Sequence, residues 1–549
     1  MDPNLLELSP WRTAVLAAVP LLYAAAAVAA LMLEQRPGAG WRIARWSAAS
    51  ALFAALLSFG GLVTGSAALW RGPALVTLGD AGALQFGLRS DALGSLMLAL
   101  VGFIGWVIVR YSQTYLAGAR GQMRYIRGLM LTLAAVSLLV VTNSLAVLAL
   151  AWVATSLALH GLLTFFEGRP QALIVAHKKF LASRVADLCL LVAVGLIGTR
   201  LGTLDIDLAI AAARALPAMP GTLQAAALLL AASAMLKCAQ LPVHGWLIQV
   251  MEAPTPVSAL LHAGVVNLGG FLLIRVGTLV ADVPAAQTLL VVVGSITAVV
   301  AALVMTTRVS IKVSLAWSTC AQMGFMLMQC GLGLYELALL HLVAHSLYKA
   351  HAFLSAGGAV EQNRLRQMTP SSPPLGAATW GFGALVGMAV TAAAALAWGL
   401  KPTAEPALWA VVGILALALV PLITGPLLRG GALGALAGMA GSMGVAMAYF
   451  GLHALFGRWL GPSAGGVPSL LLVSWVLTCF GILFMVQGVV RVWPRGALAC
   501  WLYPRLFAGL YLDELFTRLT FRVWPARVPA MPGALVTRAA RQPDSQTPP

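Results

Sequence analysis

The sequence predicts an all-α protein that crosses a membrane many times. Of its 549 residues, 60% are hydrophobic and 9% are charged, whereas soluble domains carry about 25% charged residues. The mean hydropathy is +0.91, and about 15 apolar runs approach or reach the roughly 17–25 residues that cross a bilayer. The net charge of +17 comes from Lys and Arg in short loops, so it indicates topology and not nucleic-acid binding.

Basic residues lie mostly in alternate loops, and the loops between them are poorer in Lys and Arg. The positive-inside rule then places the N-terminus outside and the C-terminus in the cytoplasm of a protein in the cell inner membrane. The first apolar run has no basic leading segment and is longer than a signal-peptide core, which indicates a retained span. The expected spans lie near residues 12–33, 47–66, 91–110, 128–142, 144–166, 184–200, 223–252, 257–280, 286–306, 312–331, 335–360, 379–400, 407–427, 431–456 and 469–490.

The chain is expected to divide into successive membrane regions and a cytoplasmic end. Residues 1–127 are expected to form N-terminal spans, residues 128–427 the central spans, and residues 428–495 the C-terminal spans. Residues 496–549 begin with mixed aromatic and charged side chains, as in an amphipathic helix at the cytoplasmic surface or under a partner. The side chains expected to dock a partner are Tyr511, Asp513, Glu514 and Arg518.

The sequence contains no pattern typical of a metal site or a nucleotide site. Its 6 cysteines are scattered, without the paired spacing that holds zinc or an iron–sulfur cluster. There is no glycine-rich phosphate loop. No cofactor is therefore expected in this chain, and the energy for transport must come from an ion gradient or a partner.

The most informative stretch runs from His341 to His351 inside an apolar span. His341, His345 and Lys349 are spaced by four residues, so they lie along one stripe of a helix. A lysine at mid-membrane costs about 2.5–3.5 kcal/mol on insertion scales. A single histidine would more often be a packed core residue, but several titratable groups on one stripe predict a route for protons or other ions.

A second lysine, Lys237, comes just before a predicted break in a span. Pro242 removes a helix hydrogen bond, and Pro254 with Pro256 is expected to do so again. An interrupted span exposes carbonyl groups, which is tolerated only beside a wet cavity or inside protein. Because burial disfavours a charged lysine, Lys237 and Lys349 are expected to release and retake protons. The expected ion path through this break comprises Lys237, Glu252 and His262.

Polar groups also enter the membrane between residues 144 and 200. His160, a further residue expected on the ion path, lies late in the fifth expected span. Arg184 and Asp187 lie three residues apart in the sixth. These two are either a structural ion pair or part of the ion path, because a carboxylate inside a span is costly. Lys178 and Lys179 are expected in the preceding loop, where they would mark the cytoplasmic face.

Three hydroxyl side chains are expected to have a structural role, and the sequence leaves two placements for one further lysine. Ser314, Ser318 and Thr319 are expected to hydrogen-bond the backbone within the tenth span. Lys401 is either a loop residue or the lysine of a second broken helix, and the distribution of basic residues favours the loop.

Three separated motifs together resemble one family of membrane proteins. They are Lys237 with the Pro-Thr-Pro-Val-Ser-Ala-Leu-Leu-His segment ending at His262, the Leu-Ala-Trp-Ser-Thr-Cys-Ala-Gln-Met-Gly segment of 315–324, and the His-Leu-Val-Ala-His-Ser-Leu-Tyr-Lys-Ala segment of 341–350. They resemble the proton-translocating antiporter-like subunits of respiratory complex I, of the large L type, and of Mrp cation/proton antiporters, over residues 90–400. The resemblance implies two inverted five-helix repeats, each with a broken helix. It also implies a proton path through Lys237, His262, His341, His345 and Lys349, beside the pair Arg184 and Asp187.

The chain departs from this family in the fifth span. The family usually has Trp-Glu there, with the glutamate as partner of the broken-helix lysine, whereas this sequence has Trp152-Val153. With His160, the Lys-Lys-Phe-Leu-Ala-Ser-Arg segment of 178–184 and the short C-terminus, the chain is more similar to membrane subunits of the DAB inorganic carbon accumulation system. That resemblance implies a large cytoplasmic zinc-binding partner of the DabA type, similar to a β-type carbonic anhydrase. Cation flow would drive CO2 hydration to bicarbonate on that partner, which would hold the zinc.

Two functions of different classes remain open from the sequence. One is an energy-coupling membrane subunit of a carbon pump, with the chemistry on its partner. The other is a proton-translocating subunit of a complex I-like dehydrogenase or an Mrp-type antiporter. A purely structural scaffold would leave the buried titratable groups as an unexplained cost.

Overall fold

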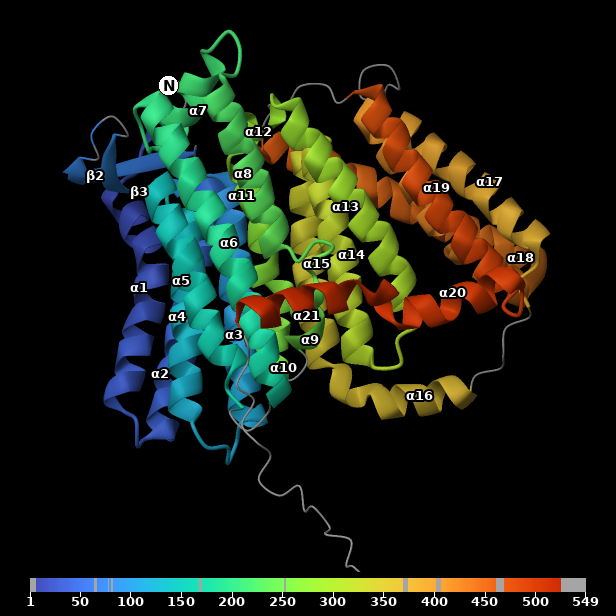
Figure 1. Ribbon diagram of the computed structural model, residues 1–549, viewed down its shortest axis with the longest axis horizontal. Coiled ribbons are helices and arrows are strands. Elements are labelled where there is room, and N and C mark those ends of the chain that lie inside the picture. Colours follow the sequence, from blue (N-terminus) through green and yellow to red (C-terminus); the bar gives the residue numbers. More distant parts are fainter. Residues whose placement is uncertain are drawn as a thin grey trace, which may run out of the picture.

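The computed structural model describes residues 6–524, except for 64–66, 78, 80–81, 167–169, 251–252, 369–373, 401–405 and 461–468. Long helices run side by side through the molecule, and two shorter helices near the C-terminus lie across them (Figure 1). Within the described residues, 11 helices are long and apolar enough to cross a membrane. The protein is therefore a multi-pass, mainly α-helical membrane protein, as the sequence predicts.

The difference between 11 helices and the predicted number of spans, about 15, has identifiable sources. Helix α8 (Gly221–Lys237) is 17 residues long and falls below the length required. Helices α14 (Ile311–Gly331) and α15 (Tyr335–Leu354) form where spans are expected but are not among the 11. Helix α18 (Pro406–Leu460) joins two expected spans across a kink at Gly431, whose φ of 55° suits glycine.

The first helices form a bundle in which neighbours along the chain pack together. Several begin at a proline, for example at Pro10, Pro37 and Pro170, where the missing N–H costs no helix hydrogen bond. Asp91 caps the third helix, because its side chain accepts a hydrogen bond from the Gly94 N–H at 2.7 Å. The helices are α1 (Pro10–Met32), α2 (Pro37–Val63), α3 (Ala92–Tyr115), α4 (Gln122–Val141), α5 (Leu145–Leu163) and α6 (Pro170–Leu201).

A small sheet at one end of this bundle was not expected from the sequence. Strand β2 (Ala68–Thr77) pairs in parallel with β1 (Leu6–Glu7) and antiparallel with β3 (Ala83–Ser90). Both longer strands are too short to register as spans, so the hydropathy pattern shows them only as a loop. Charged side chains join the sheet to the helices; we call this group the Asp91 network, and it comprises Arg71, Arg89, Asp91, Asp205, Asp207 and Arg275.

The central spans contain two interruptions. Pro242 lies in the first, a stretch without helix after α8, as predicted. Pro254 is the N-cap residue of α10 and Pro256 is its second residue, positions where proline is tolerated, and Ala253 just before them is not helical. The second interruption follows His262, at Gly264 and the 3-10 turn η3 (Val265–Asn267). The other central helices are α7 (Ile206–Arg214), α9 (Gly245–Gln249), α10 (Thr255–Ala263), α11 (Leu268–Arg275), α12 (Gly277–Ala281) and α13 (Pro284–Met305).

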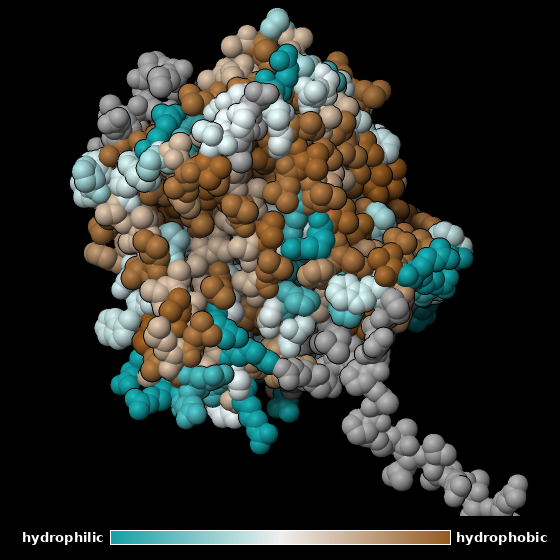
Figure 2. Space-filling view, turned by 60° about the vertical axis from the view of Figure 1, so that its left-hand side comes forward, coloured by the Kyte–Doolittle hydropathy of each residue, from teal (hydrophilic) through white to brown (hydrophobic). Residues whose placement is uncertain are grey.

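The C-terminal helices cover one side of the central spans. α17 (Ala377–Ala397) packs along α18, and α19 (Leu470–Val492) packs on α13. Lys401 lies outside the described residues, between α17 and α18. Helix α16 (Ala359–Met368) lies at the opposite end of the molecule from α7, and α20 (Ala497–Phe507) with α21 (Leu512–Val523) crosses the long helices (Figure 1). Apolar side chains cover the middle of the face in Figure 2, as a bilayer-embedded surface requires.

Candidate functional site

Charged side chains are buried together where α5, α6 and α8 meet. Lys237 is the last residue of α8 and is 5% exposed. Its Nζ donates hydrogen bonds to the Ser156 hydroxyl at 2.7 Å and to the Trp152 carbonyl at 3.4 Å. The same Nζ lies 4.4 Å from the centre of the Trp152 ring, which is cation–π geometry. We call this group the Lys237 cluster, and its members are Lys179, Arg184, Asp187 and Lys237.

Lys179 reaches the same residue of α5 from α6. It is 4% exposed, and its Nζ donates to the Ser156 carbonyl oxygen at 2.6 Å. The prediction that Lys178 and Lys179 lie in a loop is wrong, because α6 begins at Pro170 and both side chains are buried. The early start of α6 therefore adds a second lysine to the cluster, which sequence reasoning missed.

Asp187 supplies the only carboxylate of the cluster. It forms the expected pair with Arg184, with 2.6 Å between Nη2 and Oδ2. It also interacts electrostatically with Lys237 and Lys179. Val153 supplies no carboxylate, and no carboxylate of a described residue forms a direct ion pair with Lys237. The Ser156 hydroxyl and the Trp152 ring occupy that position instead.

Side chains donate hydrogen bonds to two backbone carbonyls in the break after α8. The Gln240 side chain donates to the Cys238 carbonyl at 2.9 Å, and the Cys320 thiol donates to the Ala239 carbonyl at 3.2 Å. These contacts satisfy carbonyls that the helix leaves free. The break therefore places the buried Lys237 ammonium at a helix end, where the carbonyls of Cys238 and Ala239 have hydrogen-bond donors, while Pro242 farther along the break is exposed.

A second buried group lies on α10 and α15. Lys349 has a fully buried side chain, and its Nζ donates to the Ser318 hydroxyl at 2.8 Å and the Leu315 carbonyl at 3.2 Å. The expectation that Ser318 only bonds the backbone is therefore wrong, since its hydroxyl accepts from a lysine. We call this group the Lys349 cluster, and its members are His262, His341, His345 and Lys349.

The histidines of the Lys349 cluster follow the expected stripe. The rings of His341 and His345 lie 6.0 Å apart between centroids. His341 Nδ1 lies 3.1 Å from the Gln329 side-chain oxygen. The Nε2 atoms of His341 and His345 are buried and form no hydrogen bond to a described residue. Each ring therefore keeps one nitrogen available to exchange a proton.

His262 lies beside the second interruption. It is fully buried and stacks on Phe353, with 4.4 Å between ring centroids. Asn267 closes the interruption, because its Nδ2 donates to the Ala263 carbonyl at 3.1 Å and to the Ser346 hydroxyl at 2.7 Å. His262 is thereby held against α15, which carries the other three members of the cluster.

The two clusters are separate in this structure. No hydrogen bond or ion pair of the described residues connects a member of one to a member of the other. A packing link exists, since the Cys238 thiol beside Lys237 donates to the Val266 carbonyl in the second interruption at 3.1 Å. A continuous route from Lys237 to Lys349 therefore stays a prediction.

The C-terminal segment closes over α6 and α9. Lys178, fully buried, donates to Asp513 Oδ1 at 2.9 Å, and Gln249 donates to Asp513 Oδ2 at 2.5 Å. The Asp513 carboxylate lies so close to Gly245 that a Cβ at this position would displace it. Asp513 thus binds this chain itself. Docking of a partner through this segment stays a prediction, in which the exposed candidates are Tyr511, Glu514 and Arg518.

The remaining expected site residues, His160 and Glu252, belong to neither cluster. His160, half-buried at the end of α5, meets Phe180 edge-on at 5.6 Å and interacts electrostatically with Lys179. Glu252 lies outside the described residues. Sequence reasoning missed His244, which is fully buried 4.8 Å from the Trp317 ring; its signal was its place two residues after Pro242. The described residues contain no group of His, Cys, Asp or Glu placed to hold a metal ion.

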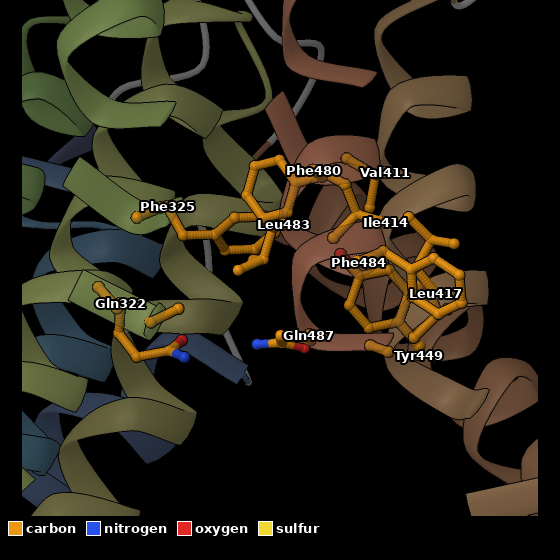
Figure 3. A pocket seen from close by; sticks show the side chains of 15 residues that line it. Gln322, Phe325, Val411, Ile414, Leu417, Tyr449, Phe480, Leu483, Phe484 and Gln487 are labelled. Atoms are coloured by element: carbon orange, nitrogen blue, oxygen red, sulfur yellow. The ribbon is translucent and has the colours of Figure 1, made fainter. Parts of the chain in front are cut away.

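A cavity of about 360 Å³ lies between α13, α14, α18 and α19 (Figure 3). Its walls are mainly apolar, with Phe325 and Phe480 in edge-to-face contact at 5.7 Å, and the amides of Gln322 and Gln487 add polar groups. Its lining includes no member of either cluster. The cavity is therefore distinct from the candidate ion path.

Two family models match parts of this chain. Residues 142–395 match the model described as NADH:quinone oxidoreductase/Mrp antiporter, TM. Residues 77–126 match the model described as NADH-Ubiquinone oxidoreductase (complex I), chain 5 N-terminus. The first match contains every member of both clusters.

Curated relatives and solved structures give a consistent picture. The chain is 42% identical to the probable inorganic carbon transporter subunit DabB of Hydrogenovibrio crunogenus, over 79% of this chain and 82% of that protein. It is 39% identical to the probable inorganic carbon transporter subunit DabB2 of Halothiobacillus neapolitanus, over 82% of this chain and 83% of that protein. A chain of the Mrp complex from Dietzia sp. DQ12-45-1b superposes with a TM-score of 0.57 and 26% identity, covering 94% of this chain and 56% of that one.

Proposed function

Because this chain belongs to the family of DabB inorganic carbon transporter subunits, we propose that it conducts protons through the membrane to drive carbon uptake. The family membership makes it a membrane subunit of an inorganic carbon transporter that works with a partner. The proton route, the identity of the partner and the chemistry on it are the parts that we propose.

The observation that carries the proposal is the burial of two lysines deep in the helix bundle. Lys237 and Lys349 are 5% and 0% exposed, and neither has a carboxylate of a described residue as direct partner. A fixed, unpaired ammonium is costly in hydrocarbon. The free-energy cost of burying such a group falls when it can lose its proton. Reversible loss of a proton is also the property that a proton path requires.

The residues of each cluster have distinct roles in this proposal. Lys237, at the end of α8, takes up and releases a proton beside the Ser156 hydroxyl. In the Lys349 cluster the lysine and the histidine rings exchange protons along α15. His262 lies at the interruption through which protons enter or leave this stripe. Arg184 and Asp187 form an ion pair that contributes to the electrostatic field around Lys237.

The proposed partner is a large cytoplasmic zinc protein of the DabA type. Proton flow through this chain would drive that protein to hydrate CO2 to bicarbonate in one direction. The zinc is assigned to the partner. The exposed side of α21 would dock it on the cytoplasmic face of the inner membrane, the face to which the basic loops point under the positive-inside rule.

The test is growth of a carbonic-anhydrase-deficient bacterium in ordinary air. Co-expression of this chain with a zinc protein of the DabA type from the same organism should restore growth, and Lys237→Ala should abolish that growth. The matched control is Lys312→Ala, because Lys312 donates to Thr255 at 2.7 Å outside both clusters. Unchanged growth of the Lys237→Ala strain, at equal amounts of membrane protein, would remove Lys237 from the path.

A second candidate is a cation/proton antiporter subunit. The match of residues 142–395 to the antiporter model and the superposition on the Mrp complex favour it. It predicts sodium/proton exchange in vesicles with no effect on growth in air. Growth that depends on the zinc partner decides for the carbon pump.

A further inference from the structure

Two lysines, and not a lysine and a carboxylate, meet on α5. Lys179 Nζ donates to the carbonyl oxygen of Ser156, and Lys237 Nζ donates to the hydroxyl of the same residue. The two ammonium groups come from different helices, α6 and α8, and both side chains are buried. Both groups are positive when protonated, so each repels the other.

The other charges around this pair do not balance it. On α6, Arg184 pairs with Asp187, so the one carboxylate of the cluster is already matched by one guanidinium. From α5, His160 interacts electrostatically with Lys179. From α21, the Asp513 carboxylate is taken by Lys178. Asp187 is therefore shared among three basic groups, and neither lysine forms a direct ion pair with a carboxylate of a described residue, in surroundings where like charges repel strongly.

Two buried ammonium groups held on one residue are coupled, so they titrate as a unit and not one by one. We propose that Lys179 is a further residue of the proton path, which shares one proton with Lys237 and so sets when Lys237 is charged. In one state the ammonium is on Lys179 and Lys237 is a neutral amine; in the other state the proton has moved to Lys237. No co-reactant is needed, because the proton that enters the pair is the one that leaves it.

This inference rests on the proposed function and names its regulation. It explains how Lys237 operates when residue 153 is a valine: repulsion by Lys179 favours the release of its proton. A purely structural Lys179, anchoring α6 to the Ser156 carbonyl, would have no effect on the pH dependence of transport. The pH profile therefore separates the two roles.

The experiment uses the full chain with its co-purifying partner, reconstituted in liposomes that contain a pH-sensitive dye. A potassium diffusion potential drives protons inward, and the rate is measured at a series of symmetric pH values. Lys179→Met removes the repelling charge, so Lys237 holds its proton more firmly. The midpoint of the rate profile should move by about one pH unit or more to the alkaline side. Lys179→Gln, which keeps a donor for the Ser156 carbonyl, should do the same and serves if the methionine variant is unstable.

The controls decide between charge and packing. Lys179→Arg keeps a positive charge, so its midpoint should not move to the alkaline side. Lys312→Met removes a lysine outside both clusters and should leave the midpoint unchanged. An unshifted midpoint in Lys179→Met and Lys179→Gln, or an equal alkaline shift in Lys179→Arg, would overturn the inference. Absence of proton flux in the unmodified protein at every pH would instead overturn the proposed function.

Discussion

The Asp91 network and the Lys237 cluster both bury arginine or lysine, but they differ in charge balance. In the network, Asp91 binds Arg275 through both carboxylate oxygens and also Arg89, at 2.8 Å from its Nε. Arg89 also pairs with Asp207, and Arg71 with Asp205 at 2.7 Å. Each arginine of the network thus has a carboxylate partner. In the Lys237 cluster, one carboxylate serves three basic groups.

The difference shows in the behaviour expected of Asp91. Burial alone would raise the pKa of this carboxyl, but Arg275 and Arg89 hold it well below its usual range. Asp91 therefore stays charged at every physiological pH. The network is a fixed structural element that joins the sheet, α3, α7 and α11, whereas an unbalanced cluster can change its proton content. The comparison teaches that charge imbalance in a buried site, more than burial itself, indicates function here.

The largest effect is expected when the charge of Lys237 or Lys349 is removed, because neither lysine has a carboxylate of a described residue as direct partner. Lys237→Gln and Lys349→Gln should each lower proton flux by at least about a hundredfold and leave thermal stability nearly unchanged. If the clusters act in series, the double variant should be no worse than either single one, and liposome flux measures this. Half of the flux left in each single variant would mean two parallel routes, and a large loss of stability would mean that the lysines are structural.

In the Asp91 network, a substitution should lower stability and leave the pH dependence of flux unchanged. Asp91→Asn leaves Arg275, whose side chain is 2% exposed, without its counter-charge, and removing one partner of a buried pair costs about 3–5 kcal/mol. We expect a clearly lower unfolding temperature in detergent, with the midpoint of the pH profile of flux unmoved in the protein that remains folded.

The Asp91 carboxylate should also make the unmodified protein less stable at acid pH. Because the pKa of Asp91 is depressed, its contribution to stability is present above the unfolded-state value of about 3.9 and is lost as pH falls below it. Thermal unfolding at graded pH should show this loss in the unmodified protein and a weaker pH dependence in Asp91→Asn. Equal slopes would mean that the network does not stabilise the fold.

The smallest expected effects concern the hydroxyl groups that hold the two lysines. Ser156→Ala and Ser318→Ala each remove one acceptor from a lysine Nζ, at 2.7 and 2.8 Å. A hydrogen bond to a charged group is worth about 1.5–3 kcal/mol, so flux should fall about tenfold or somewhat more. Threonine at either position keeps the hydroxyl and should restore flux. Failure of threonine to restore it in a stable protein would mean that packing, and not the hydroxyl, matters.

Sequence reasoning located most of the site because helical spacing is local. His341, His345 and Lys349 had to share a stripe once the span was helical, and Pro242 had to end a helix. Ser318 and Lys179 were misjudged for the opposite reason. Their partners, Lys349 and the Ser156 carbonyl, lie on other helices, and one sequence does not indicate which residues of neighbouring helices meet.

The sequence by itself determined that this protein is a bundle of membrane helices with lysines and histidines inside it, because hydropathy and spacing act along the chain. Only the tertiary structure decided which charges meet. It paired Asp91 with two arginines, Asp513 with Lys178, and Ser156 with two lysines at once. The physical reason is that the energy of a buried charge depends on distances of a few ångströms between helices, and the packing of the folded chain sets these distances.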